Sequence, residues 1–418
     1  MSDATPNIRF KDFTDDWEQR KLGDMVSFSK GSGYSKGDLK EDGIPIILYG
    51  RLYTKYETVI SEVDTFADEK KGSVFSKGGE VIVPASGETA EDISIASVVE
   101  KSGVLLGGDL NIITTPDDMD SAFLAISISN GKPHNDMAKM AQGKSVVHLH
   151  NSDLEKIDLP YPSYDEQRRI SGFFSDLDNL ITLHQRKCDE TKQLKRYMLQ
   201  KMFPRNGATR PEIRFSGFTD DWEQRKLGAV FEEYSEKKHE ELPPLTIIQG
   251  NGTILREESD RALQYDKNSL SGYKMVKKDD FIVHLRSFEG GLEKANQDGI
   301  ISPAYHTFHG DNTDSRFYYP FFRSKRFIDA LLKPHVYGIR DGKSIDIEGM
   351  KTILIPVPSY DEQKKIGEFI ESIDNLITLH QRKCDSFKQL KAYMLQNMFV
   401  KQLRPVMDIN IRRNGCRN

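Results

Sequence analysis

Two long stretches of this sequence occur twice, and this duplication constrains the fold more than any other feature. Residues 6–23 and 211–228 agree at 15 of 18 positions, at an offset of 205. Residues 162–203 and 358–399 agree at 30 of 42 positions, at an offset of 196. Self-similarity of this length indicates a structural unit present in two copies rather than one large fold.

The repeats enclose two blocks with little mutual similarity, the first block (24–161) and the second block (229–357). The closely matching repeats should have the same structural role in both halves of the chain, whereas the divergent blocks should have related but different functions. One half decaying after duplication is the alternative, which fits poorly with two blocks that both look well folded. The plan predicts domains at 1–161 and 204–357, spacer helices at 162–203 and 358–399, and a tail at 400–418.

Each copy of the longer repeat predicts a helix that packs on another helix. Both copies begin Pro-Ser-Tyr-Asp-Glu-Gln, so Ser163 with Glu166 predicts a capping box, as does Ser359 with Glu362. No Pro or Gly follows the first few turns, which allows about 40 residues, or roughly 60 Å, of helix. Apolar residues recur at spacings of three and four, typical of an antiparallel coiled coil. The expected pairing positions are Ile170, Phe174, Leu177, Ile181, Leu194, Met198, Ile366, Ile370, Ile373, Ile377, Leu390 and Met394.

Polar residues also fall on these helices. Cys188 and Cys384 lie on the apolar stripe, so we interpret them as small buried hydrophobic residues rather than redox sensors. His184 and His380 lie near the helix centres. We interpret them as ordinary exposed histidines, and a meeting at the axis of the helix pair is the alternative.

The shorter repeat is too short to be a domain. Its aromatic residues, Trp17 and Trp222 among them, should anchor each block to the helix pair. A ligand-binding role for either tryptophan is the less favoured interpretation.

Both blocks have the pattern of mixed α and β domains. Strands are predicted near 44–49, 80–84, 93–96, 104–106 and 111–113, and a helix near 120–129, in the first block. Strands near 245–249, 280–286 and 304–308 and a helix near 317–332 are predicted in the second. The expected fold class is α+β, with two mixed domains joined by two long antiparallel helices under pseudo-two-fold symmetry.

Polar loops that contain glycine occur at corresponding places in both blocks. Their side chains are of the types that contact phosphates and base edges. Solvated turns explain any single loop better, but their paired occurrence favours function. The candidate DNA-contacting residues are Lys30, Ser32, Tyr34, Lys36, Ser86, Glu88, Thr89, Gln142, Lys144, Ser145, Arg286, Ser287, Phe288, Tyr337, Arg340, Lys343 and Ser344.

Charge restricts where such contacts can lie. The chain has 59 Lys+Arg against 64 Asp+Glu, a net charge of −5, which argues against a nonspecific nucleic-acid coat. Residues 316–344 hold seven Lys/Arg against two Asp, a local excess of +5. The sequence therefore predicts local basic faces rather than a basic protein.

Motifs for other functions are missing from the sequence. Gly143-Lys144-Ser145 and Gly342-Lys343-Ser344 end like a phosphate-binding loop, but its first glycine is replaced by Ala138 and Tyr337. We expect no catalytic residue and no metal site in this chain. Three widely spaced cysteines and no long apolar run predict a cytoplasmic protein without a membrane span.

The sequence resembles the specificity (S) subunits of type I restriction-modification systems. The resemblance rests on Phe-Thr-Asp-Asp-Trp-Glu-Gln-Arg-Lys-Leu-Gly at Phe13 and Phe218, on the helix starts at Pro162 and Pro358, and on the duplicated plan. It implies that the blocks are target recognition domains reading an asymmetric bipartite target in double-stranded DNA.

The resemblance also implies partners. Two methyltransferase (M) subunits would use S-adenosylmethionine, and two restriction (R) subunits would use ATP and Mg, so this chain needs no cofactor of its own. The tail, with five Lys/Arg and one acid, departs from the plan of that family. It could fold back onto the N-terminal segment, contact a partner subunit or be disordered, and the sequence does not choose among these. A DNA-modification enzyme with its own recognition domain and a structural coiled-coil adaptor are the alternative functions.

Overall fold

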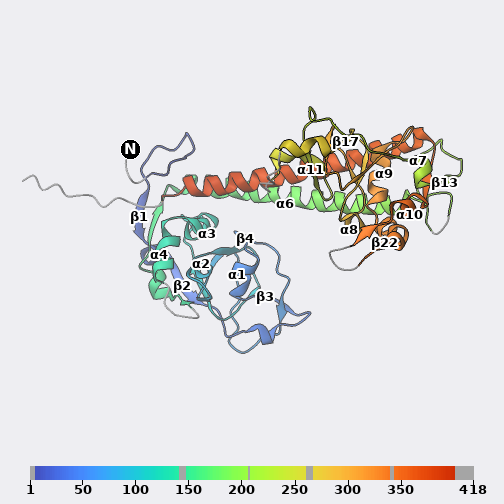
Figure 1. The fold of residues 1–418 in the computed structure, drawn as a ribbon. Coiled ribbons are helices and arrows are strands. Elements are labelled where there is room, and N and C mark those ends of the chain that lie inside the picture. Colours follow the sequence, from blue (N-terminus) through green and yellow to red (C-terminus); the bar gives the residue numbers. More distant parts are fainter. Residues whose placement is uncertain (1–4, 141–146, 206–207, 260–266, 339–342, 401–418) are drawn as a thin grey trace, which may run out of the picture. The chain divides into compact units, whose positions relative to one another are not determined.

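Both copies of the longer repeat form one continuous helix each, α6 (Tyr164–Lys201) and α11 (Tyr360–Asn397), drawn side by side in Figure 1. The computed structural model describes residues 5–140, 147–205, 208–259, 267–338 and 343–400. The chain divides into unit 1 (residues 1–183 and 383–418) and unit 2 (residues 184–382). Each unit therefore contains part of both long helices. No helix in the described ranges is long and apolar enough to cross a membrane.

Contacts between the two helices recur in each unit with the partners exchanged. In unit 1, Lys391 Nζ lies 2.5 Å from Asp178 Oδ1. In unit 2, Lys195 Nζ lies 2.6 Å from Asp374 Oδ1. The repeat offset of 196 converts one pair into the other, so each unit contains the same contact with the two helices exchanged. As the residue number rises along α6 from 178 to 195, the number of the paired residue falls along α11 from 391 to 374. The helices therefore run antiparallel, as predicted.

Both cysteines and one histidine of the seam are buried. Cys188 and Cys384 are 1% and 0% exposed, and their thiols face the carbonyl oxygens of Ile377 and Ile181, which confirms them as packing residues. His184, 8% exposed, places its Nδ1 3.0 Å from Nδ1 of His380. The preferred interpretation of two exposed histidines was therefore wrong, and the alternative of a meeting between them holds.

The predicted pairing stripe needs correction at two equivalent positions. Leu194 and Leu390 are 48% and 40% exposed. The next residues, Lys195 and Lys391, occupy the seam instead, because their aliphatic stems reach across to aspartates of the other helix. Six of the other positions are buried and four are partly buried; the buried ones are Ile170, Phe174, Leu177, Ile366, Ile370 and Ile373, and the partly buried ones are Ile181, Met198, Ile377 and Met394.

The first block folds around a five-stranded sheet of order β2-β10-β6-β8-β4 and a three-stranded sheet of order β5-β3-β9. Helices α3 and α4 pack together against this part of unit 1 (Figure 1). The strands of unit 1 are β1 (Glu18–Lys21), β2 (Ser27–Lys30), β3 (Ile44–Ile47), β4 (Val59–Ile60), β5 (Phe66–Ala67), β6 (Glu80–Pro84), β7 (Ser86–Gly87), β8 (Ser97–Val99), β9 (Leu105–Leu106), β10 (Leu110–Thr114), β11 (Val147–His148) and β12 (Asp158–Tyr161). Its shorter helices are η1 (Leu22–Asp24), η2 (Lys36–Asp38), α1 (Gly50–Thr54), α2 (Ala90–Ile93), α3 (Ser121–Asn130), α4 (Lys132–Met140) and α5 (Asn151–Leu154).

The second block has a four-stranded sheet of order β14-β21-β18-β19. The strands of unit 2 are β13 (Glu223–Lys226), β14 (Glu232–Tyr234), β15 (Leu245–Ile248), β16 (Gly252–Leu255), β17 (Lys274–Val276), β18 (Phe281–Val283), β19 (Glu293–Lys294), β20 (Gly299–Ile301), β21 (His306–His309), β22 (Val336–Tyr337), β23 (Ser344–Ile345) and β24 (Leu354–Val357). Its shorter helices are α7 (Leu227–Val230), η3 (Arg256–Glu258), η4 (Lys267–Gly272), α8 (Ser287–Gly290), α9 (Ser315–Phe322), the π-helix η5 (Arg326–Leu332), η6 (Lys333–His335) and α10 (Ile347–Lys351).

The two sheets share their central ladder although the blocks differ in sequence. Strand β10 pairs antiparallel with β2 and β6, and β21 pairs in the same way with β14 and β18. Two local predictions were wrong. Residues 93–96 are not a strand: a capping box of Thr89 with Asp92 starts helix α2, which ends at Ile93, and the next strand, β8, begins only at Ser97. The helix predicted near 317–332 is divided, since α9 ends at Phe322 before η5 begins.

The start of each long helix is clamped to the shorter repeat. Arg9 makes a bidentate pair with the fully buried Glu166, with Nε–Oε1 and Nη2–Oε2 distances of 2.7 Å each. Arg214 binds Glu362 in the same way, at 2.6 and 2.7 Å. The capping box was therefore predicted only in part: the amide of Glu362 donates to Ser359 Oγ at 3.4 Å, but its carboxylate faces the arginine.

The glutamine of the same motif forms a second clamp. The amide of Asp120, the N-cap residue of α3, donates to Gln167 Oε1 at 3.0 Å. In unit 2 the amide of Asp314, the N-cap residue of α9, donates to Gln363 Oε1 at 3.1 Å. The repeated motif thus holds each domain to its long helix through two adjacent side chains.

The tryptophans anchor each domain to the end of a long helix, as predicted. Trp17 packs edge-on against Phe123 and Phe399, the latter just after α11. Trp222 packs against Phe203 and Phe317, and its Nε1 donates to Glu362 Oε2 at 3.0 Å.

The N-terminal segment closes on the end of α11 in unit 1. The Ile8 amide donates to Asn397 O at 2.9 Å, and the equivalent Ile213 amide donates to Lys201 O at 3.0 Å in unit 2. Val400 is buried, and its carbonyl accepts from the Lys132 amide at 3.2 Å. The rest of the tail, 401–418, lies outside the described residues.

Candidate nucleic-acid interface

The loop after β2 divides into structural and exposed residues. Tyr34 is 6% exposed, and its hydroxyl donates to Asp68 O at 3.0 Å. Ser32 Oγ accepts from the Val74 amide at 3.1 Å. Both side chains therefore shape the loop, which removes Tyr34 from the candidate contacts. Lys30 and Lys36 are exposed and stay candidates.

The loop after β6 is tied to β11. Ser86 is buried, and its Oγ lies 3.0 Å from Nδ1 of the exposed His148. Thr89 accepts from the Asp92 amide at 3.1 Å and caps α2. Glu88 is exposed beside them. Ser86 is thus better placed to position His148, which sequence reasoning missed for lack of any motif, than to contact a ligand itself.

Four of the candidate DNA-contacting residues lie in segments that the structure does not describe. Gln142, Lys144, Ser145 and Arg340 are outside the described residues.

In unit 2 the equivalent loop follows β18. Ser287 is fully buried, and its Oγ accepts from the His284 amide at 2.9 Å, so it is not a surface contact. Arg286 is exposed and Phe288 is half-buried. Leu285, which the sequence analysis did not select, is 65% exposed.

His284 at the start of this loop has a strongly lowered pKa. Burial of the imidazole is the main cause, and the charge of Arg323 adds to it; together they lower the pKa of His284 to about 4. Its Nδ1 accepts from the Arg286 amide at 3.3 Å, while Nε2 has no partner in the described part of the chain. His284 is therefore a neutral side chain that orders the loop at neutral pH.

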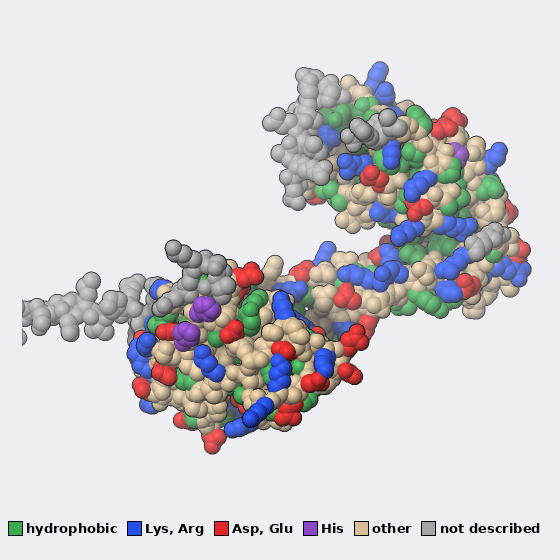
Figure 2. Space-filling view, turned by 90° about the horizontal axis from the view of Figure 1, so that it is seen from below, with side chains coloured by type: hydrophobic (Ala, Val, Ile, Leu, Met, Phe, Trp, Pro, Cys, Tyr) green, Lys and Arg blue, Asp and Glu red, His purple; other side chains and the backbone are tan. Residues whose placement is uncertain are grey.

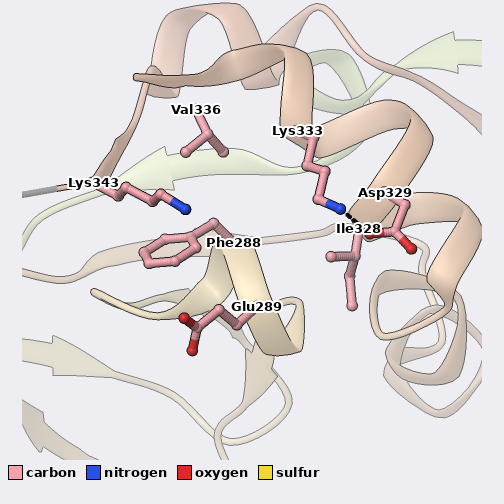
Figure 3. Close-up of a pocket in the computed structure, with 7 residues that line it drawn as sticks. All are labelled: Phe288, Glu289, Ile328, Asp329, Lys333, Val336 and Lys343. Carbon is pink, nitrogen blue, oxygen red and sulfur yellow. Dashed lines mark hydrogen bonds and ion pairs between the residues drawn. The ribbon is translucent and has the colours of Figure 1, made fainter. Parts of the chain in front are cut away.

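A shallow cavity of about 290 Å³ brings the predicted residues Phe288 and Lys343 together (Figure 3). Lys343 Nζ lies 5.5 Å from the ring centroid of Phe288, within cation–π range. The wall is completed by Glu289, Ile328, Asp329, Lys333 and Val336. Tyr337 and Ser344 pair in the adjoining β22–β23 ladder, and both are exposed.

Three of the seven basic residues in 316–344 are paired with carboxylates in the described part of unit 2, so the basic stretch is less available than expected. Arg316 binds Asp314 and Glu371, Arg323 binds the buried Glu293, and Lys333 binds Asp329. Arg326 donates to the Pro204 carbonyl. On the visible face of each unit, Lys and Arg side chains are interspersed with Asp and Glu (Figure 2). A continuous basic stripe is therefore not what the fold presents on that face.

Each long helix also carries an exposed apolar pair at the same repeat position. Leu194 and Tyr197 are 48% and 51% exposed in unit 2, and Leu390 and Tyr393 are 40% and 57% exposed in unit 1. Because the pair occurs in both copies, we name these two surfaces the helix patches.

The family described as "Type I restriction modification DNA specificity domain" matches this chain twice, over residues 14–193 and 219–389. The type I restriction enzyme MjaVIII specificity subunit of Methanocaldococcus jannaschii is 23% identical over 412 residues, which cover 93% of each chain. The putative type I restriction enzyme MjaX specificity subunit of the same organism is 21% identical over 416 residues, covering 93% of this chain and 94% of the relative.

The fold is also found among solved structures. The crystal structure of a type I restriction-modification S subunit from M. genitalium superposes with a TM-score of 0.58 at 13% identity. The match covers 94% of this chain and 99% of that one. At this identity the likeness concerns the fold alone.

Proposed function

The chain belongs to the family of type I restriction-modification DNA specificity subunits, and from that premise we propose that it reads an asymmetric, bipartite target in double-stranded DNA. Such a specificity subunit is not itself catalytic. The observation that carries the proposal is one sheet plan with two different sets of loops: β2-β10-β6 in unit 1 and β14-β21-β18 in unit 2. Two domains with the same sheet and different loops are suited to binding two different DNA sequences.

The antiparallel helices suit the geometry of duplex DNA. Two DNA strands run antiparallel, so readers related by a two-fold axis meet equivalent half-sites in inverted orientation. Unlike loops then give unlike half-sites, with an unread gap between them. The reciprocal pairs Lys391–Asp178 and Lys195–Asp374 support this relation between the helices.

Partner subunits would supply the chemistry. Two M subunits would bring S-adenosylmethionine, and two R subunits would bring ATP and Mg, in the cytoplasm. The helix patches favour a partner bound twice, since exposed apolar pairs at equivalent positions offer the same surface in each unit. Partners would also supply basic surface that this acidic chain lacks.

The test is to purify the chain with and without its M subunit and to sequence the methylated bases of plasmid DNA. We expect methylation only by the complex, at one asymmetric bipartite motif. Methylation by the chain alone would instead support an enzyme with its own recognition domain. A complex that methylates no defined motif would support a structural adaptor.

A further inference from the structure

The cavity beside α8 holds a hydrogen-bond acceptor and a donor on either side of an aromatic ring. Figure 3 shows Phe288 between Lys343 and Glu289, with Ile328 and Val336 completing an apolar wall. We propose that this cavity reads one C·G base pair in the half-site of the second recognition domain. Glu289 accepts from the cytosine amino group, and Lys343 donates to guanine. This inference rests on the proposed function.

The size of the cavity fits the edge of a base rather than a cofactor. Its volume of about 290 Å³ lies just below the usual range of ligand pockets, which begins at about 300 Å³. It is open to solvent at the surface where three separate segments meet: α8, η5 with η6, and the β22–β23 ladder. A base edge in a groove needs only such a shallow, partly apolar recess.

The polar groups of the cavity differ in whether the fold already uses them. Lys333 Nζ is bound to Asp329 Oδ1 at 2.5 Å, so this pair is internally neutral. Glu289 makes no side-chain hydrogen bond or ion pair with any residue in the described ranges, and it is exposed. Lys343 has the Phe288 ring as its contact and, within the same ranges, no carboxylate partner. Glu289 and Lys343 therefore remain for a ligand.

The chemistry of these two groups distinguishes among base pairs. A carboxylate accepts from the amino group of cytosine or adenine in the major groove, whereas the O6 and N7 of guanine would repel it; the ammonium favours C·G over A·T, because guanine offers it two adjacent acceptors and thymine only one. An ammonium donates to guanine O6 and N7, the commonest kind of specific contact. One carboxylate and one ammonium, unpaired with each other, thus match the two halves of a C·G pair. A phosphate would be attracted by Lys343 but repelled by Glu289, and the Lys333–Asp329 pair is neutral, so the cavity offers no net positive charge for a phosphate.

The neighbouring loop has the composition of a DNA-facing surface. Leu285 is 65% exposed and Tyr337 is 59% exposed, next in the chain to Arg286 and to Val336 of the cavity. These exposed side chains suit contact with bases and sugars around the base pair that is read.

The experiment compares the methylated motif of wild type with those of Glu289→Gln and Lys343→Met in the purified complex with the M subunit. Both variants should relax the motif at one C·G position, with discrimination there reduced roughly 10- to 100-fold. That position should lie in the half-site retained when residues 24–161 are exchanged for another such block. Glu232→Gln and Lys278→Ala make the same charge changes on exposed residues of unit 2 outside the cavity, and should leave the motif unchanged.

The outcomes separate this inference from the function on which it rests. If wild type yields no bipartite motif, the proposed function fails. If wild type yields one but both cavity variants leave it unchanged, relax the other half-site or relax an A·T position, the cavity inference alone is overturned. Equal thermal unfolding temperatures of wild type and Glu289→Gln exclude misfolding as the cause of a relaxed motif.

Discussion

Glu166 and Glu362 are buried carboxylates at equivalent positions of the longer repeat, and each holds the start of a long helix to the shorter repeat. Each is at most 1% exposed and is neutralised by an arginine of the shorter repeat. Hydrogen bonding to the carboxylate raises the pKa of both Arg9 and Arg214. A buried charge is tolerated only with such a partner. The clamp therefore makes the short repeat indispensable to the start of each long helix.

Replacing Arg214 with methionine should lower the free energy of unfolding by about 3–5 kcal/mol, because Glu362 is left buried without its charge partner. The double variant Arg214→Met/Glu362→Gln should recover part of this loss. Denaturant unfolding measures both. The control is Arg210→Met, whose pair with Asp221 is more than half exposed and should cost about 0–1 kcal/mol. Equal losses for the two single variants would refute the clamp.

His284 should make the second domain sensitive to acid. Its pKa is lowered from 6.5 to about 4 in the folded protein, so the unfolded chain takes up a proton first as the pH falls. The stability contributed by the neutral imidazole is thus present above about pH 6.5 and is lost towards pH 4. The unfolding temperature should fall less between pH 7 and 5 in His284→Asn than in wild type. Parallel curves for the two proteins would contradict this account.

We propose that the long helices act as a spacer between the two recognition domains, so their length should set the unread gap. Inserting one heptad at equivalent positions of α6 and α11 adds about 10.5 Å, or roughly three base pairs. We expect methylome sequencing to show a longer gap and unchanged half-sites. Insertion into one helix alone breaks the reciprocal pairs and should prevent a stable fold. Altered half-site bases in the double insertion would rule out the spacer role.

The helix patches should each hold one M subunit. Replacing Leu194 and Tyr197 with lysine removes one patch and leaves Leu390 and Tyr393 intact. The mass of the purified complex should then correspond to one M subunit instead of two. Gln193→Lys, which adds a charge beside the patch, is the control and should leave two. Two M subunits on the double-lysine variant would place their contacts elsewhere.

At the scale of the whole molecule, the duplicated plan predicts that the domains read independently. Exchanging residues 24–161 for the corresponding block of another specificity subunit should change one half-site and keep the other, as read by methylome sequencing. The physical reason is that the clamps of Glu166 and Gln167 lie in the repeat, outside the exchanged block, and so survive on the helix side. A change in both half-sites would show that the domains do not read independently.

Local patterns in the sequence were sufficient to predict the two long helices, α6 and α11. The apolar spacing of three and four predicted α6 and α11, and the burial of Cys188 and Cys384 followed from their place on that stripe. The same pattern failed at Leu194 and Leu390, since a one-dimensional spacing does not record which side chain the opposite helix offers. Aspartates across the seam select the neighbouring lysines there.

For the candidate DNA contacts, too, the sequence identified residue types but not which side chains are free to bind. Residue type alone grouped Tyr34 and Ser287 with Lys36 and Lys343 as candidate contacts, but the hydroxyls of Tyr34 and Ser287 form hydrogen bonds with backbone groups inside the fold. Likewise, a count of Lys and Arg over 316–344 does not reveal that Arg316 and Arg323 are bound to acids from other segments. Glu289 was missed because an isolated acid has no sequence signature.

By itself the sequence determined the duplicated plan and the two long helices, because repeats and periodic apolar residues are local properties of the chain. Only the tertiary structure decided which polar groups remain for DNA. That choice depends on partners far apart in sequence: Arg214 with Glu362, Lys195 with Asp374, and Phe288 with Lys343. Charges that find such partners hold the fold together, and those that do not are the ones available for recognition.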